Sequence, residues 1–286
     1  MALPGNATST DDRSARARRF EGRRALVTGA SRGIGAGIAE RLAAQGADVV
    51  ITARTLDAHP TLPGSLRETA ERLERYGTRI GVVVADLAEG DDRSRIVPES
   101  TELLRGPIDI LVNNAAAAIY APTSEQPLRR RRITFEVNVH APVDLAQSVI
   151  PAMRDRGEGW IVNLTSGSTR HAQGPPFEPG FSVTLGIYGA SKAALNRESN
   201  ALAQELWNTG IRVNAVEPRA AVMSEGAEVL AGHIITEDQK ESLEEMVEAT
   251  VFLCDCGAEQ TGGVHVSLDL IAAHALRVKN LDGTDR

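Results

Sequence analysis

Short apolar runs alternate with helical patterns along most of this chain. The first run, RALVT at residues 24–28, precedes a helical pattern at 33–46 that closes at a glycine. Strands that are almost wholly apolar must be buried on both faces, which is typical of a parallel sheet covered by helices. Right-handed crossovers then join such strands into a doubly wound sheet. The sequence therefore predicts an α/β fold with helices on both faces of the sheet.

The predicted elements fill one domain of about seven strands, a doubly wound parallel sheet of the Rossmann type. We expect an N-terminal tail at 1–20, which is polar and arginine-rich, the single domain at 21–272 and a C-terminal tail at 273–286. The strands are expected at 24–28, 47–53, 79–85, 108–114, 159–166, 211–218 and 263–268, and the helices at 33–46, 65–77, 91–105, 127–154, 188–210 and 237–254.

Composition and charge restrict the classes of function. The 286 residues carry a net charge of −7, which argues against nucleic acid or an anionic membrane as the main partner. The basic run at 129–132 is a local exception, read as a solvated or interface face.

No run reaches the ~20 apolar residues of a membrane helix, and the first residues lack the apolar core of a signal peptide. Cys254 and Cys256 are too close in a helix to pair. We expect a soluble, cytoplasmic protein without a bound metal, since the six histidines show no metal-ligand spacing.

A glycine-rich turn follows the first predicted strand. The sequence TGASRGIG places Gly29, Gly33 and Gly35 between that strand and a helix N-terminus. Free backbone N–H groups and the helix dipole at such a turn attract an anion, and glycines let a pyrophosphate approach closely. Glycines also occur in plain turns, so the position of this loop after a buried strand is what favours a dinucleotide site.

A tyrosine and a lysine stand one helical turn apart. The stretch IYGASKAAL at 187–195 places Tyr188 and Lys192 at positions i and i+4, on one face of a helix. Taken alone, such a pair is more often a ring packed on a lysine stem than a catalytic device. The other motifs change that expectation.

Five motifs, in order and on the expected elements, make this sequence similar to the short-chain dehydrogenase/reductase family over about residues 22–270. They are the T-G-x3-G-x-G pattern of residues 28–35, Asn113-Asn114-Ala115-Ala116 after the fourth strand (with Ala in place of the usual Gly), Asn138, Ser166 and Tyr188-x3-Lys192. The resemblance implies that Tyr188 exchanges a proton with the substrate oxygen, which Ser166 hydrogen-bonds. Lys192 would hold the nicotinamide ribose, and Asn138 would keep a water in a relay. Ser168 is the alternative to Ser166, and Asn138 has a structural alternative as a residue that kinks its helix.

The implied role of Tyr188 demands a special environment. Lowering the pKa of a phenol from ~10 to about 7 requires ~4 kcal/mol, and an exposed ion pair supplies ~1 kcal/mol or less. Lys192 must therefore act in a partly dry site, helped by the positive charge of the oxidised nicotinamide.

The second predicted strand favours NADP over NAD. It ends Thr52-Ala53-Arg54-Thr55, with no acid before Asp57 to hold the ribose hydroxyls. Arg54, with Arg32 from the glycine turn, is expected to hold a 2′-phosphate, unless both arginines are simply solvated. The resemblance implies a cofactor site made by Gly29, Ser31, Arg32, Gly33, Ile34, Gly35, Arg54, Asp86, Leu87, Asn114, Tyr188 and Lys192.

Two regions depart from the family pattern. Pro218-Arg219 replaces Pro-Gly after the sixth strand, and the hydroxyl residue near the nicotinamide amide falls at Ser224 or, in the other register, is replaced by Met223. The last strand runs into SLDLIAAHALRV where the family has a glycine-rich end.

We expect an NADP(H)-dependent oxidoreductase that interconverts a secondary alcohol and a ketone. The alternatives are an NAD-dependent dehydrogenase of the same family and a non-catalytic, nucleotide-sensing protein, which would not need the Ser, Tyr, Lys and Asn set. An enoyl reductase would space Tyr and Lys more widely, and a hydrolase would carry a Gly-x-Ser-x-Gly elbow.

Two features concern the partners. Apolar residues at Val137, Val143, Leu195 and Leu202 exceed what one sheet face can bury, and the resemblance implies a homodimer or homotetramer. The long stretch 171–186 lies between Ser166 and Tyr188 and is too rich in glycine and proline for a regular element. Its apolar side chains are expected either to form a wall that favours an apolar small-molecule substrate or to pack on a neighbouring subunit; they are Phe177, Phe181, Val183 and Leu185.

Overall fold

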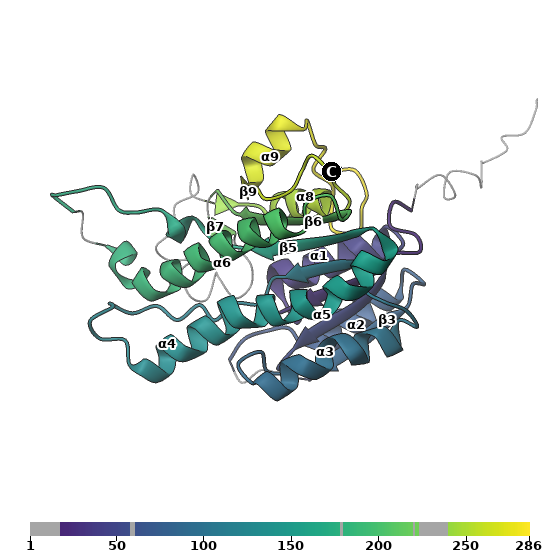
Figure 1. Cartoon of the computed structure of the whole chain (residues 1–286), viewed down its shortest axis with the longest axis horizontal. Helices are drawn as coiled ribbons and strands as arrows, with labels where there is room; N and C mark the ends of the chain where they lie inside the picture. The colour runs from purple at the N-terminus through teal and green to yellow at the C-terminus, as the bar shows by residue number, and fades with distance from the viewer. Residues whose placement is uncertain (1–17, 58–60, 178–179, 220, 223–239) are drawn as a thin grey trace, which may run out of the picture.

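Seven parallel strands form one sheet at the centre of the computed structural model, with the order β3-β2-β1-β4-β5-β6-β9 (Figure 1). The structure describes residues 18–57, 61–177, 180–219, 221–222 and 240–286. Successive strands move outward in one direction from β1 to β3 and in the other from β4 to β9. The order therefore reverses between β1 and β4, which is the switch point at which such sheets bind ligands. The predicted single-domain doubly wound sheet is confirmed.

The bounds of the elements follow the predicted ones to within a few residues. The strands of the sheet are β1 (Arg24–Thr28), β2 (Asp48–Ala53), β3 (Ile80–Val84), β4 (Ile110–Asn113), β5 (Gly159–Leu164), β6 (Ile211–Glu217) and β9 (Val264–Val266). The helices are α1 (Gly33–Ala44), α2 (Leu66–Glu74), α3 (Gly90–Leu103), α4 (Leu128–Phe135), α5 (Ala141–Arg156), α6 (Gly186–Glu205), α8 (Leu243–Leu253) and α9 (Ser267–Ala273). None of the helices in the described ranges is long and apolar enough to cross a membrane.

Two apolar cores lie on opposite faces of the sheet. One packs α1, α2 and α8 against the sheet, and the other packs α3, α5 and α6, which Figure 1 shows in front. Neighbouring residues of one strand serve the two cores in turn: Ala25 and Val27 face the first, and Leu26 faces the second. Burial on both faces explains why the strands read as continuous apolar runs.

Local signals set the ends of several helices. Ser65 accepts a hydrogen bond from Glu68 N (3.1 Å) and caps α2, and Ser242 with Glu245 forms a capping box at the start of α8. Gly157 ends α5 with a φ of 72°, a left-handed conformation that glycine adopts without steric cost.

The structure differs from the predicted elements in five places. The helix expected at 127–154 is interrupted by a π-helical turn, η1 (Glu136–His140), between α4 and α5. The stretch at 171–186 contains a short 3₁₀ turn, η3 (Phe181–Thr184), and another, η2 (Gly167–Thr169), follows β5. A second sheet pairs β7 (Ala221–Val222) with β8 (Lys240–Glu241). The last strand ends at Val266 because α9 begins at Ser267.

The C-terminal segment packs on α1 and α8. The guanidinium of Arg41, fully buried in α1, donates to Glu248 (2.6 Å) and to the carbonyls of Lys279 (2.7 Å) and Asn280 (2.6 Å). Glu248 also accepts from Lys279 N (3.2 Å). A buried guanidinium needs a countercharge and hydrogen-bond acceptors, and here the last residues of the chain supply several of the acceptors. The N-terminal residues 1–17 lie outside the described residues, whereas Phe20 is buried in the core beside α1.

Candidate functional site

The glycine turn after β1 is in direct contact with the turn after β4. Gly29 has a φ of 67°, and a Cβ at Gly35 would lie 2.6 Å from the Gly29 carbonyl oxygen and would collide with the amide of Asn114. That amide donates to the carbonyls of Thr28 (2.8 Å) and Gly29 (3.2 Å). Thr28 returns the contact, since its hydroxyl accepts from the backbone N–H of Asn114 (3.0 Å). Only glycine fits at position 35, because the two turns of the switch point touch there.

A pocket of about 490 Å³ opens beside these turns, at the carboxyl ends of the central strands. Its wall combines residues of the glycine turn, the β4 turn, the end of β5, the segment before α6 and the segment after β6. Five of the predicted site residues lie in this wall: Ile34, Asn114, Ser166, Tyr188 and Lys192. The structure therefore brings the predicted cofactor turn and the predicted catalytic groups to one cavity.

Tyr188 is almost completely buried in this wall, with 9% of its surface exposed. Burial raises the pKa of its phenol well above the usual value, the charge of Tyr120 adds a smaller rise, and a hydrogen bond with Ser166 acts in the opposite direction. The Ser166 hydroxyl also accepts from Ser168 N (3.2 Å). Tyr188 is therefore a protonated phenol at neutral pH, next to the hydroxyl of Ser166.

Both serines after β5 line the pocket, but their hydroxyls differ. The Ser166 hydroxyl is hydrogen-bonded to the Tyr188 phenol and to the backbone N–H of Ser168. The Ser168 hydroxyl is buried and has no hydrogen-bond partner among the described residues. Ser166 is the serine that contacts the phenol of Tyr188.

Lys192 is buried one helical turn after Tyr188, with 2% of its surface exposed. Its Nζ donates to the carbonyl of Leu164, at the end of β5, over 2.7 Å. Burial lowers the pKa of this ammonium to about 8. A primary ammonium has three donors, and the printed contact uses one of them. The pocket wall that Lys192 joins can thus offer donors to a bound ligand.

Asn138 lies behind the pocket rather than in its wall. It belongs to the π-helical turn η1, is fully buried, and accepts from Ala117 N (2.7 Å) while donating to Ser191 (3.0 Å) and the Ala117 carbonyl (3.4 Å). One acceptor position of its amide remains. The side chain holds the β4 turn onto α6, the helix of Tyr188. The predicted water relay and the alternative role in kinking the helix both stay predictions.

The two arginines predicted to hold a phosphate have protein partners here. Arg32 donates to the carbonyls of Pro63 (2.6 Å) and Gly64 (2.8 Å), in the stretch between β2 and α2. Arg54 is 3.7 Å from Asp86, and its side chain is 68% exposed. Of the other predicted cofactor residues, Gly29, Ser31 and Gly33 belong to the glycine turn, where Ser31 is buried, and Leu87 is buried after the end of β3.

The stretch 171–186 contributes two of its four apolar residues to the pocket. Phe181 and Leu185 line it, whereas Phe177 and Val183 are 63% and 57% exposed. Tyr120, which sequence reasoning did not single out, lines the pocket between Phe181 and Tyr188. Its signal in the sequence was slight: one of three tyrosines, four residues after the Asn-Asn-Ala-Ala motif.

Arg219, which replaces the usual glycine, also lines the pocket. Its backbone N–H donates to the buried Glu241 (2.8 Å), and its guanidinium pairs with Asp269 of α9. Ser224 and Met223, the two candidates for the nicotinamide amide, lie outside the described residues. Within the described ranges, no three His, Cys, Asp or Glu side chains gather so that they could hold a metal ion.

Comparison with known proteins decides the family. The family model of short chain dehydrogenases matches residues 23–228. The chain belongs to the short-chain dehydrogenase/reductase family. Members of this family are oxidoreductases that act with NAD(P).

Relatives agree with this family over most of the chain. Hydroxysteroid dehydrogenase-like protein 2 of Bos taurus is 30% identical over 264 residues, which are 90% of this chain but 59% of the length of that relative. A short chain dehydrogenase of Mycobacterium thermoresistibile has a TM-score of 0.79 at 27% identity, covering 92% of this chain and 91% of its own. A 3-oxoacyl (acyl-carrier-protein) reductase of Agrobacterium tumefaciens, solved with NADP bound, has a TM-score of 0.74 at 28% identity over 88% of this chain and 96% of its own.

The buried lysine of this dehydrogenase gives a prediction on stability. The unfolded chain keeps the Lys192 proton up to about pH 10.4, and the folded chain loses it near pH 8 because the ammonium is desolvated. Between these values the unfolded state binds more protons, so stability rises with pH. Urea unfolding without nucleotide should show the wild type gaining stability relative to Lys192→Met as the pH is raised from 8 to 10.

Lys279→Met, the same substitution outside the pocket, is the control for the loss of a lysine side chain. A stability difference between wild type and Lys192→Met that does not change with pH would contradict the desolvation of Lys192.

Proposed function

We propose that this protein is an NADP(H)-dependent oxidoreductase that interconverts a secondary alcohol and a ketone, with Tyr188 as the acid and base. One observation carries the proposal: Ser166, Tyr188 and Lys192 meet in the wall of one pocket, beside the glycine turn at the switch point of the sheet. The two other readings of the sequence, an NAD-dependent dehydrogenase and a nucleotide sensor, share the turn. A sensor has no use for a buried phenol bonded to a serine hydroxyl.

The residues around the pocket fit a nicotinamide dinucleotide. The backbone at Gly29 and Gly35 passes so close to Asn114 that a side chain there would collide with it. Because both residues are glycines, the N-terminus of α1 stays open to a phosphate. Lys192 has donors in the pocket wall for the hydroxyls of a ribose. Ile34 and Asn114 would contact the cofactor near the reacting ring, while Gly29, Ser31, Arg32, Gly33 and Gly35 would hold its phosphates, and Asp86 and Leu87 its adenine.

When bound, the nicotinamide would supply or accept the hydride and, when oxidised, a positive charge near the phenol. Tyr188 gives its proton to the carbonyl oxygen of a ketone, and Ser166 donates a hydrogen bond that orients this oxygen. The raised pKa of Tyr188 keeps the phenol protonated at neutral pH, which is the form that reduction needs. In the oxidation direction the phenol must first lose its proton, and the nearby charges of Lys192 and the cofactor favour the phenolate.

The residues after β2 support NADP. No acid stands at the end of this strand, and Arg54 is exposed there. A guanidinium binds a phosphate in bidentate geometry, which an acid in its place would repel. The 3-oxoacyl reductase of Agrobacterium tumefaciens, whose fold this chain shares, was solved with NADP.

The lining of the pocket favours an apolar substrate. Tyr120, Phe181 and Leu185 line the pocket, and Ala118 and Val222 extend this apolar lining. We therefore propose ketones and alcohols with bulky apolar groups as the substrate class. The names of relatives point in a similar direction, a steroid in one and a 3-oxoacyl chain in another.

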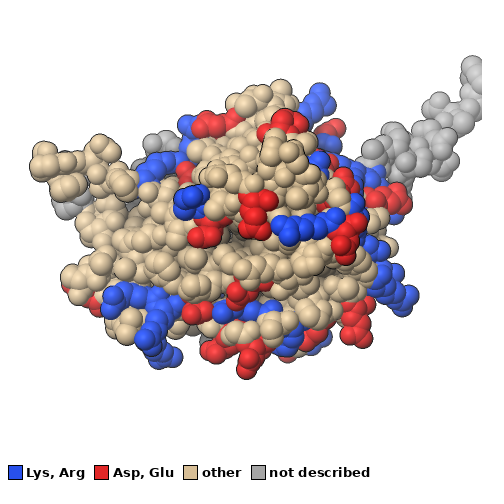
Figure 2. Space-filling view, viewed as in Figure 1, with Lys and Arg blue, Asp and Glu red and all other residues tan. Residues whose placement is uncertain are grey.

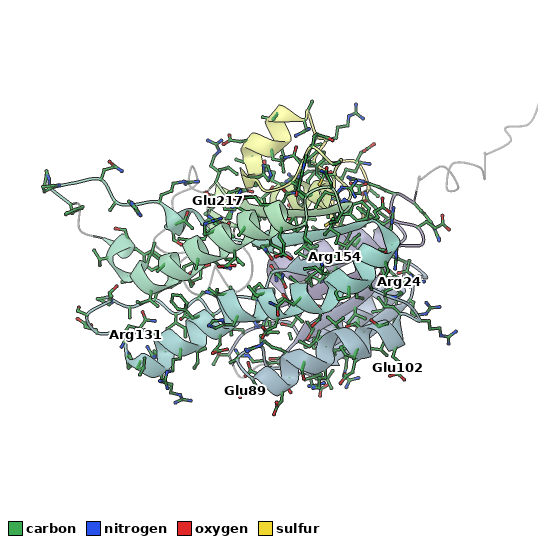
Figure 3. All side chains as sticks on the ribbon, in the orientation of Figure 1. Arg24, Glu89, Glu102, Arg131, Arg154 and Glu217 are labelled. Atoms are coloured by element: carbon green, nitrogen blue, oxygen red, sulfur yellow. The ribbon has the colours of Figure 1, made fainter. Side chains whose placement is uncertain are left out.

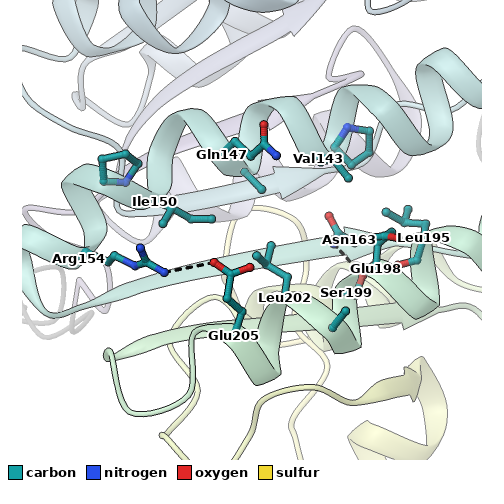
Figure 4. A pocket seen from close by; sticks show the side chains of 14 residues that line it. Val143, Gln147, Ile150, Arg154, Asn163, Leu195, Glu198, Ser199, Leu202 and Glu205 are labelled. Atoms are coloured by element: carbon teal, nitrogen blue, oxygen red, sulfur yellow. Dashed lines mark hydrogen bonds and ion pairs between the residues drawn. The ribbon is translucent and has the colours of Figure 1, made fainter.

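A groove between α5 and α6 supports a homodimer or homotetramer. It has a volume of about 380 Å³ and is lined by Val143, Ile150, Ala201 and Leu202 (Figure 4). Figure 2 shows a mostly uncharged surface between these helices, and the groove lining also includes Arg154, Glu198 and Glu205. Of the four apolar residues predicted for an interface, Val143, Leu195 and Leu202 line the groove. Leu195 is buried within this chain, and Leu202, like Val137, is partly buried against the core. The four arginines at 129–132 on α4 are exposed, and Arg131 points outward from it (Figure 3).

The first test removes the proposed acid. Tyr188→Phe keeps the ring and its packing but loses the proton, so turnover of a ketone should fall by at least about 10²-fold, the range of general acid catalysis. The dissociation constant for NADPH should stay within about twofold of the wild type. NADPH absorbance with a panel of secondary alcohols and ketones gives the rates, and Tyr76→Phe, far from the pocket, is the control. A Tyr188→Phe enzyme that retains most of its kcat would overturn the assignment.

The second test concerns the choice of cofactor. Arg54→Ala should weaken NADPH by about tenfold or more and leave NADH within about twofold, because one charged hydrogen-bonding group contributes about 1.5–3 kcal/mol. Arg79→Ala is the matched control: it removes an arginine that pairs with Asp48 at the opposite end of the sheet. Tighter binding of NADH than of NADPH by the wild type would contradict the proposal.

The third test concerns the groove. Light scattering at micromolar concentration should give a dimer or tetramer, and Ala201→Glu, which places a charge in the groove, should dissociate it. Gln204→Glu lies on the same helix outside the groove and should leave the assembly intact. A wild type that is monomeric would refute this interface.

A further inference from the structure

The ring of Tyr120 lies between the proposed acid and the stretch before it. Its centroid is 5.4 Å from that of Tyr188, with an interplanar angle of 87°, and 5.2 Å from that of Phe181, with an angle of 80°. Both contacts are edge-to-face, an arrangement that aromatic rings prefer. Tyr120 is thus in contact with the catalytic ring on one side and with the wall of the pocket on the other. We call Phe181, Tyr120 and Tyr188 the aromatic bridge.

The backbone next to the aromatic bridge is joined as well. Ala121 N donates to the carbonyl of Thr184 over 3.1 Å, which ties the segment after β4 to the turn that carries Phe181. Two residues further on, a Cβ at Gly186 would collide with the hydroxyl of Thr123. The two segments therefore dock on one another at the start of α6, the helix of Tyr188. A shift of Phe181 must be felt by Tyr120, because close-packed rings transmit displacement.

We propose that Tyr120 is a positioning and specificity residue: it fixes the ring of Tyr188 and, with Phe181, senses a ring or branched apolar group next to the substrate carbonyl. This inference rests on the proposed role of Tyr188 as the acid. All three rings of the bridge line the pocket, so a substrate in the pocket contacts the same side chains that hold the acid. Misplacing a catalytic group by about 1 Å can cost 10²-fold in rate. Through the aromatic bridge, the position of the Tyr188 phenol depends on which substrate group contacts Phe181.

The first experiment needs neither substrate nor turnover. The chain has three tyrosines, so protein labelled with ¹³C-tyrosine gives three ring signals, assigned by Tyr→Phe variants. No ring contact joins Phe181 directly to Tyr188 among the described residues. Phe181→Leu should therefore shift the Tyr120 and Tyr188 signals and leave that of Tyr76 unchanged. Phe177→Leu, the same change at an exposed position of the same stretch, should move none. An unmoved Tyr188 signal in Phe181→Leu would overturn the inference whatever the protein catalyses.

The second experiment measures coupling in the reaction. Tyr120→Leu and Phe181→Leu should each lower kcat by about tenfold, the size of one aromatic contact. The double variant should be no slower than Tyr120→Leu, because both changes break one bridge. Losses that multiply in the double variant would show that the rings act independently and would refute the bridge.

Two comparisons separate positioning from a merely structural role. Tyr120→Phe keeps the ring and should retain kcat within about twofold, whereas a loss as large as that of Tyr120→Leu would contradict positioning by the ring. In Tyr120→Leu, KM should rise for a phenyl or cyclohexyl ketone and stay constant for a small aliphatic one, although kcat falls for both. Equal KM changes for the two ketones would refute the specificity role. Absence of any ketone reduction by the wild type would instead refute the proposed function and leave the NMR result to stand on its own.

Discussion

A lysine ammonium is buried where β5 ends, at a cost in desolvation, and it lies in the wall of the pocket. Desolvation of Lys192 is offset by one carbonyl of the strand, and its pKa falls to about 8. A protein keeps such a group only where the surrounding backbone fixes it, which here means the end of a buried strand and the first turns of α6. The same dry surroundings raise the pKa of Tyr188, whereas they lower that of Lys192, because burial disfavours the charged form of each group. The protonated phenol of Tyr188 and the ammonium of Lys192, which has donors left over, therefore line one cavity. In the proposed function, both would act on a charged ligand bound there.

Periodicity and motif order were sufficient to predict the sheet and the meeting of Ser166, Tyr188 and Lys192 in one pocket. Strands buried on both faces leave an unmistakable apolar run, and motifs at strand ends must meet at one edge because parallel strands share their direction. Tyr120 escaped prediction because its contacts join two irregular segments far apart in the sequence, and neither has a period. The partners of Asn138 were hidden for a similar reason: a π-helical turn aims its amide at the β4 turn instead of along the helix. The roles of the cofactor residues remain predictions, although the structure gives their positions.

Arg32 and Arg54 would have to exchange their present partners if they bound the phosphate of a cofactor. Arg32 is held by two carbonyls between β2 and α2, and Arg54 pairs loosely with Asp86. The exposed pair contributes little, so Arg54 can exchange its carboxylate for a phosphate at small cost. Arg32 would have to give up two short hydrogen bonds. In the proposed function, the discrimination between the two nicotinamide cofactors would therefore depend more on Arg54 than on Arg32 in the glycine turn.

The contacts of Arg41 have a consequence for the order in which the chain can be completed during synthesis. This arginine belongs to the first helix, yet its countercharge is Glu248 and two of its acceptors are the carbonyls of Lys279 and Asn280. While a ribosome is still making the second half, the first β-α-β units carry a cation that has no place to be buried. The emerging domain must leave the end of α1 hydrated until the last turns of the chain arrive. The packing around the end of α1 is thus completed late, although this helix is made first.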